Sequence, residues 1–92
     1  DKDKTYAYPN PVYDGNVKIR IAVESAEIVE IMIYDFAGYF VEKFTMENLT
    51  QGEIHEKIWN IADIESGVYF ANITATNGTK SESEILKIGV IK

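Results

Sequence analysis

The chain has 92 residues, 46% of them hydrophobic and 26% charged, which is the composition of a folded domain with a single core. Nine basic residues against 15 acidic ones give a net charge of −6, so the surface repels phosphate backbones and we expect no nucleic-acid partner. No apolar stretch approaches the roughly 20 residues of a membrane-spanning helix. The absence of cysteine excludes thiol chemistry, disulfides and the usual zinc sites.

The front of the chain is charged rather than apolar. It begins Asp1-Lys2-Asp3-Lys4, which is unlike a signal peptide and typical of the cut end of a linker. We therefore expect residues 1–5 to be a linker remnant of a longer protein. Residues 6–92 are then expected to form one domain.

Two segments near the front alternate between apolar and polar residues. This period of two predicts strands at residues 17–23 and 26–34, each with one face on a core and the other in water. The predicted inner residues are Val17, Ile19, Ile21 and Val23 in the first strand, and Val29, Ile31 and Ile33 in the second.

The middle of the chain contains turn residues. Asp35-Phe36-Ala37-Gly38 predicts a turn, because Gly38 can take a positive φ, and residues 39–44 would complete a hairpin. Residues 46–52 are polar and are predicted to be irregular. Residues 53–60 regain a strand pattern.

The last third predicts a second hairpin. After a link at 61–65, residues 68–76 are rich in β-branched and aromatic types, and residues 81–91 predict the final strand. Asn77-Gly78 is a strong signal for a two-residue hairpin loop. Such a loop pairs Tyr69 with Leu86 but Ile73 with Glu82. Either the tip extends beyond the core or a bulge shifts the register.

These segments together predict the fold class. No apolar stripe with helical spacing persists over three turns, so we expect no substantial helix. About seven short strands with turn residues between them predict an all-β, immunoglobulin-like antiparallel β-sandwich.

Residues with catalytic potential are few. His55 is the single histidine, and Ser25 and Ser66 lie in predicted turns without a nucleophile motif. The carboxylates of Asp35, Asp63 and Glu65 lie where turns usually carry acids. A sandwich of this size has little room for a deep cleft, so we predict no catalytic residue and no enzyme activity.

A few residues are candidates for metal or carbohydrate binding. The available metal ligands are oxygens, which suit calcium, and the local candidates are Asp14-Gly15-Asn16 and Asn60 with Asp63. Ordinary turn chemistry explains these residues better, so we predict no metal and no cofactor. Planar side chains can stack on sugars. The aromatic candidates for a carbohydrate-binding accessory domain are Tyr13, Tyr34, Tyr39 and Phe40.

An ordered set of landmarks resembles a known family. Tyr8-Pro9-Asn10-Pro11 stands first, followed by the Val29-x-Ile31-x-Ile33-Tyr34-Asp35 segment with Gly38 and Val41 after it. Gly52, Trp59 and Ser66-Gly67-Val68-Tyr69-Phe70 come later, and a short apolar strand ends at Lys92. Over about residues 8–92 this order resembles the C-terminal sorting domains of the type IX secretion system. It is also similar to the immunoglobulin-like domain of flagellar hook-capping proteins.

The resemblance implies a non-enzymatic tail of a larger secreted or cell-surface protein. In that family the tail is recognised in the periplasm of a Gram-negative bacterium and directs passage through the outer membrane. The partners would be secretion machinery or domains of the parent protein. The expected recognition element is the final strand, with Leu86, Lys87, Ile88, Val90, Ile91 and Lys92. The alternatives are an immunoglobulin-like spacer and a carbohydrate-binding accessory domain.

Overall fold

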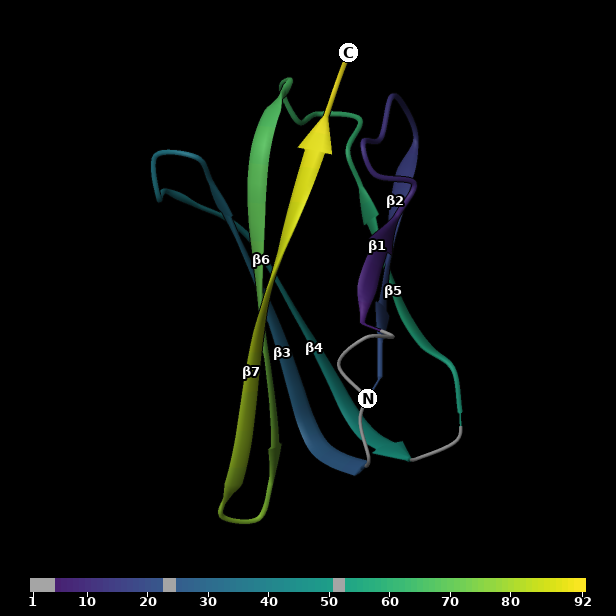
Figure 1. The fold of residues 1–92 in the computed structure, drawn as a ribbon, viewed down its shortest axis with the longest axis vertical. Helices are drawn as coiled ribbons and strands as arrows, with labels where there is room; N and C mark the ends of the chain where they lie inside the picture. Colours follow the sequence, from purple (N-terminus) through teal and green to yellow (C-terminus); the bar gives the residue numbers. More distant parts are fainter. Residues whose placement is uncertain (1–4, 23–24, 51–52) are drawn as a thin grey trace.

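The computed structural model describes residues 5–22, 25–50 and 53–92 as two antiparallel sheets packed face to face (Figure 1). The three-stranded sheet, in the order β1-β2-β5, contains β1 (Tyr6–Tyr8), β2 (Asn16–Ile21) and β5 (His55–Asn60). The four-stranded sheet, in the order β4-β3-β6-β7, contains β3 (Ser25–Asp35), β4 (Phe40–Thr50), β6 (Gly67–Asn77) and β7 (Lys80–Val90).

The predicted fold class is confirmed. The described part of the chain contains no helix, and so no helix there is long and apolar enough to cross a membrane. Its strands form the two layers of an immunoglobulin-like sandwich. Residues 1–4 of the expected linker lie outside the described residues. Thr5 is buried in the domain, where its Oγ1 accepts a hydrogen bond from the Ala22 N–H at 2.9 Å.

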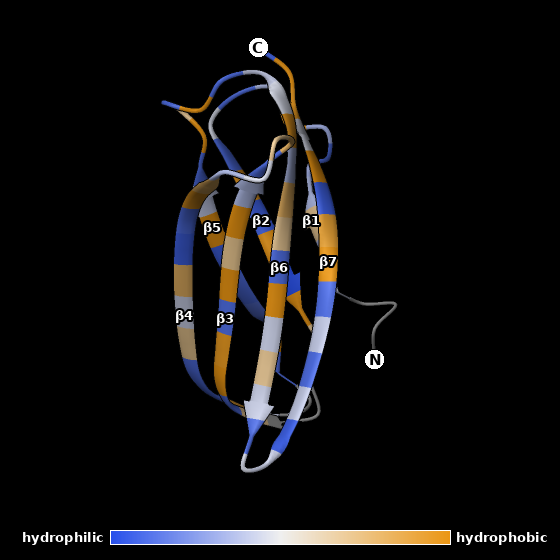
Figure 2. Ribbon diagram, turned by 90° about the vertical axis from the view of Figure 1, so that its left-hand side faces the viewer, coloured by the Kyte–Doolittle hydropathy of each residue, from blue (hydrophilic) through white to orange (hydrophobic). Residues whose placement is uncertain are grey.

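The core lies between the two inner sheet faces, as the alternation predicted. Along β3 the orange segments are separated by blue and paler ones (Figure 2), and the predicted inward side chains of β2 and β3 that the structure describes are 0–2% exposed. These residues are Val17, Ile19, Ile21, Val29, Ile31 and Ile33. Val23, the last predicted inner residue of the first strand, lies outside the described residues.

Trp59 and Tyr69 join the two layers. Their rings meet edge to face at 5.6 Å, and both side chains are buried. The Tyr69 hydroxyl donates a hydrogen bond to the Glu65 carbonyl at 2.7 Å, which ties β6 to the connection before it. This is the tyrosine-corner arrangement of immunoglobulin-like domains. Burial, with Glu65 and Asp35 nearby, raises the pKa of Tyr69.

The prediction of an irregular segment at 46–52 is wrong for residues 46–50. They continue β4, with Met46 opposite Val29 and Leu49 opposite Ala26. Leu49 is buried and Met46 packs against the core, so apolar contacts with β3 outweigh the polar local composition. Residues 51–52 lie outside the described residues, and β5 begins at His55 rather than at residue 53.

The predicted register of the last hairpin is also wrong. Asn77 pairs with Lys80, so the two-residue loop is Gly78-Thr79, and Gly78 takes a φ of 63°. Tyr69 therefore faces Ile88 rather than Leu86. Pairing runs without a bulge from Asn77 to Gly67. A glycine in the first loop position suits a type II′ turn, which leaves Asn77 in the strand.

Candidate recognition surface on the last strand

The segment after β1 crosses from one sheet to the other. Val12 forms a parallel bridge with Val90 of β7. Its N–H donates to the Gly89 carbonyl at 2.8 Å, and its own carbonyl accepts from the Ile91 N–H at 2.9 Å. The front of the domain therefore lies against the free edge of the last strand.

The Asn10 amide completes this contact. Its Nδ2 donates to the Lys87 carbonyl at 2.8 Å, and its Oδ1 accepts from the Gly89 N–H at 2.9 Å. The Asn10 side chain thus satisfies one carbonyl and one N–H at the edge of β7, as the backbone of a neighbouring strand would. The two flanking prolines have no N–H, which suits an edge position. A Cβ at Gly89 would lie 3.4 Å from the Pro11 Cβ, so the two segments are in van der Waals contact here.

The strand separates the six predicted recognition residues into two sets. Ile88 and Val90 point into the core and are 0% and 2% exposed, and Leu86 packs against the core from a half-buried position. Lys87 and Lys92 are exposed, and Ile91 is 49% exposed. In the folded domain a partner can therefore contact the second set directly.

Lys92 is tied to the link between β5 and β6. Its ammonium donates to the carbonyls of Ile61 and Ala62, the latter at 2.8 Å. Its backbone N–H donates to Ser66 Oγ, also at 2.8 Å. Ser66 thus helps to fix the position of Lys92.

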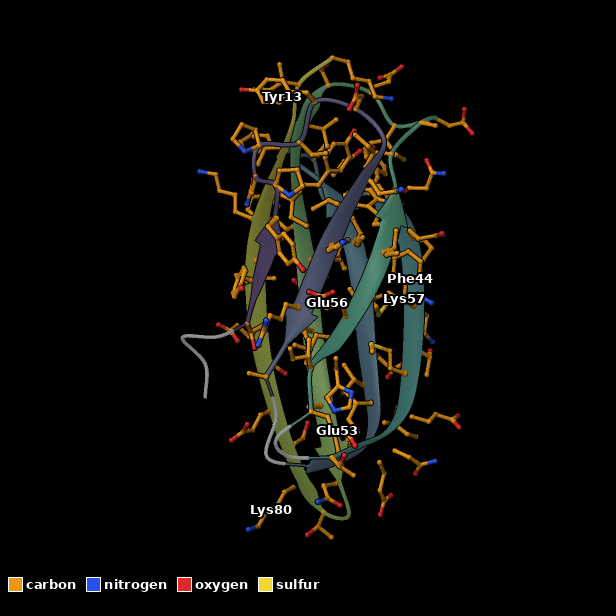
Figure 3. The ribbon with its side chains drawn as sticks, turned by 90° about the vertical axis from the view of Figure 1, so that its right-hand side faces the viewer. Tyr13, Phe44, Glu53, Glu56, Lys57 and Lys80 are labelled. Atoms are coloured by element: carbon orange, nitrogen blue, oxygen red, sulfur yellow. The ribbon has the colours of Figure 1, made fainter. Side chains whose placement is uncertain are left out.

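The other half of β7 has a different character. Glu82 lies opposite Ala75 and Glu84 opposite the buried Ile73, so both acids are on the inward side near the hairpin. Figure 2 shows β7 changing from blue and white at the hairpin to mainly orange toward the C-terminus. Lys80 lies at the hairpin tip, at the opposite end of the domain from Tyr13 (Figure 3). Charges at such positions discourage pairing with another chain.

The outer face of the three-stranded sheet carries a polar and aromatic network. The Tyr8 hydroxyl donates to the Glu56 carboxylate, and this bond, more than burial, raises the pKa of Tyr8. The Lys18 ammonium lies 5.9 Å from the Tyr8 ring centre. On the inward side of β5, opposite Ile19, the Lys57 ammonium lies 5.2 Å from the centre of the Phe44 ring of β4, and Figure 3 shows the two side by side. These contacts hold β1 and β5 in place.

The residues weighed for catalysis or metal binding have local contacts. His55 Nε2 lies 3.2 Å from the Thr50 N and 2.9 Å from the Thr50 O. Asn60 Oδ1 accepts from the Ala62 N–H at 2.8 Å, which is turn chemistry. Within residues 5–22, 25–50 and 53–92, no three His, Asp or Glu side chains gather into a possible metal site.

The structure divides the aromatic candidates as well. Tyr34 and Phe40 are cross-strand partners, and Tyr39 lies next to Phe40 in the chain. Tyr13, 62% exposed, belongs to the β1–β2 connection instead. Two further aromatics, Phe36 and Phe70, lie with the first group. Sequence reasoning missed them, because only the pairing of β3 with β6 brings Phe70 opposite Tyr34.

Fold and surface together define a small immunoglobulin-like module whose last strand is bonded by the front of the same chain. The family model described as the secretion system C-terminal sorting domain matches residues 6–87, and the chain belongs to this family. These are the type IX sorting tails that the sequence landmarks resemble: non-catalytic targeting modules of secreted or cell-surface proteins. No curated protein and no solved structure matches the chain significantly.

Proposed function

We propose that this domain directs a larger protein through the periplasm and across the outer membrane of a Gram-negative bacterium. The family supports the sorting role. In this proposal the secretion machinery contacts Lys87 on the outward side of β7 and the two residues that follow the strand, Ile91 and Lys92. The observation that carries it is their exposure beside a strand end that Asn10, Val12 and Ser66 hold in place.

Electrostatics favours the same residues. The chain has a net charge of −6, and Lys87 and Lys92 place two positive charges in its final six residues. An acidic patch on the machinery would be attracted here and repelled by most of the remaining surface. Leu86, Ile88 and Val90 would contribute from within, by holding the strand in the geometry that is recognised.

The test is secretion of a reporter. Residues 1–92 are fused to the C-terminus of a periplasmic reporter in a host with type IX machinery, and reporter is measured in the medium, on the surface and in the periplasm. We expect export with the native tail. A Lys87→Ala/Ile91→Ala double variant should leave the reporter in the periplasm.

A matched control lies on the same strand. Ile85 is 64% exposed on the outer face of the other half of β7, so an Ile85→Ala tail should be exported like the native one. Circular dichroism checks that both tails are folded. Retention of the native fusion in the periplasm would instead favour an immunoglobulin-like spacer. Normal export of the double variant would place recognition elsewhere on the domain.

A further inference from the structure

Four aromatic side chains gather on the outer face of the four-stranded sheet and at the adjoining β3–β4 turn. We call them the aromatic platform: Tyr34, Phe36, Phe40 and Phe70. The rings of Phe36 and Phe70 lie 6.3 Å apart at an interplanar angle of 30°. Those of Tyr34 and Phe40 meet edge to face at 6.0 Å. The platform thus contains two ring pairs on neighbouring strands.

The platform is exposed to an unusual degree. Phe36 is 76% exposed and Phe40 55%. Large apolar side chains that gather in this way on a monomer mark a binding surface more often than single exposed ones do. Because the core of the sandwich is complete without them, packing does not account for their position.

The turn that presents these rings is held by several hydrogen bonds. Asp35 Oδ1 accepts from the N–H groups of Ala37 at 3.0 Å and Tyr39 at 2.9 Å. The Asp35 backbone N–H donates to the Tyr39 carbonyl at 2.9 Å, and its carbonyl accepts from the Gly38 N–H at 3.0 Å. The turn projects beyond the sheet (Figure 1). Binding here would therefore require little ordering of the backbone.

A hollow adjoins the platform. It has a volume of about 300 Å³ and lies between the β3–β4 turn and the start of β6. Phe36 forms part of its wall, and the acids Asp35 and Glu65 and the hydroxyl-bearing Ser66 line it too. This is the small end of the range for small-molecule sites, which combine aromatic walls with a few polar groups.

The chemistry of the lining selects the ligand. Two acids and no Lys or Arg line the hollow, and the chain carries a net charge of −6, so an anionic ligand would be repelled. A pyranose ring presents an apolar C–H face that fits an aromatic ring, and hydroxyls at its rim that can donate to carboxylates. We infer that the aromatic platform and its adjoining hollow form a binding site for neutral oligosaccharides, which meets the sorting surface only where Ser66 contacts Lys92.

The inference can be tested on the isolated domain by calorimetry and by amide chemical-shift mapping. The probes are cellohexaose, mannohexaose and N-acetylchitohexaose, with hexagalacturonate as the anionic comparison. We expect at least one neutral probe to bind and to shift signals from residues 34–40 and 65–70. Hexagalacturonate should not bind. Phe36→Ala and Phe40→Ala should each weaken binding about threefold to tenfold.

Tyr13→Ala is the matched control, because Tyr13 is a comparably exposed aromatic outside the platform, and it should leave binding unchanged. The inference is overturned if no neutral probe binds at roughly 10 mM, if the shifts map elsewhere, or if Phe36→Ala binds like the native chain. A reporter fused to the Phe36→Ala tail should still be exported. The sugar site and the sorting proposal can therefore fail independently.

Discussion

The two halves of β7 are protected in different ways against pairing with another chain. Both lie at the edge of the four-stranded sheet, where unpaired backbone groups invite another chain. From Lys87 onward the edge is bonded by Asn10 and Val12, and the inward residues are core. Toward the hairpin the inward positions carry Glu82 and Glu84 instead. One half is protected by the front of its own chain and the other by charge.

This difference bears on function. A half that is bonded on both edges and anchored in the core presents Lys87 and Ile91 in a defined geometry, which a recognition element needs. The charged half has fewer contacts to hold it and extends to the hairpin tip. Four measurements follow from the comparison, in order of decreasing expected effect.

The first measurement compares isoleucines from the two halves. Ile88→Ala removes a fully buried side chain and should lower the free energy of unfolding by about 3 kcal/mol. Ile85→Ala, on the exposed face, should change it by less than about 0.5 kcal/mol. Urea denaturation of both variants gives the difference. Equal losses of unfolding free energy would show that both halves of β7 contribute equally to the core.

The second tests the Asn10 amide. Asn10→Ala removes both hydrogen bonds to β7 and should cost about 1–2 kcal/mol. Asn10→Asp can still accept from the Gly89 N–H but cannot donate to the Lys87 carbonyl. At neutral pH its loss of unfolding free energy should therefore differ from that of Asn10→Ala. Hydrogen exchange at the Gly89 amide should accelerate in the alanine variant. An unchanged exchange rate would contradict the edge role of Asn10.

The third tests protection by charge. A Glu82→Val/Glu84→Val variant removes both acids from the inward side and should associate at concentrations where the native domain is a monomer. Sedimentation velocity measures this. The Glu82→Lys/Glu84→Lys variant keeps a charge at each position and should stay monomeric. Association of the lysine variant would assign the effect to the particular side chains rather than to charge.

The fourth concerns pH in the buried half, where Tyr69 faces Ile88. The pKa of Tyr69 is raised above its ordinary value of 10.0 in the folded chain, chiefly by burial. The unfolded state therefore loses this proton first, and the stabilising contribution, complete below pH 10, is lost as the pH rises through the folded pKa. Tyr69→Phe should make the urea midpoint less sensitive to pH above 10. An unchanged alkaline slope would contradict this.

The accuracy of the sequence prediction varied with the range of the interaction involved. The alternation along residues 17–21 and 29–33 correctly identified inward residues, because successive side chains of any strand point to opposite faces. The β4 extension to Thr50 was missed because its local composition is polar, and contacts of Met46 and Leu49 with β3 decide it. The hairpin register was wrong because Asn77-Gly78 admits more than one two-residue loop.

The candidate sites follow the same division. Lys87, Ile91 and Lys92 were predicted from the final strand, but the burial of Ile88 and Val90 depends on the opposing sheet. The two Asn10 hydrogen bonds connect residues that are separated by 77 and by 79 positions in the chain, and no local pattern predicts them. Phe70 could not be grouped with Phe36 before the pairing of β3 with β6 was known.

By itself, the sequence determined that this is an all-β sandwich of the sorting-tail family, because alternation and turn residues are local properties and the landmarks survive in order. The tertiary structure was needed to see which half of the last strand is hydrogen-bonded along its edge by Asn10 and Val12, and which half turns charged residues inward. The same holds for the four rings that form one surface. The physical reason is that edges and patches depend on which strands are neighbours, and long-range pairing sets that.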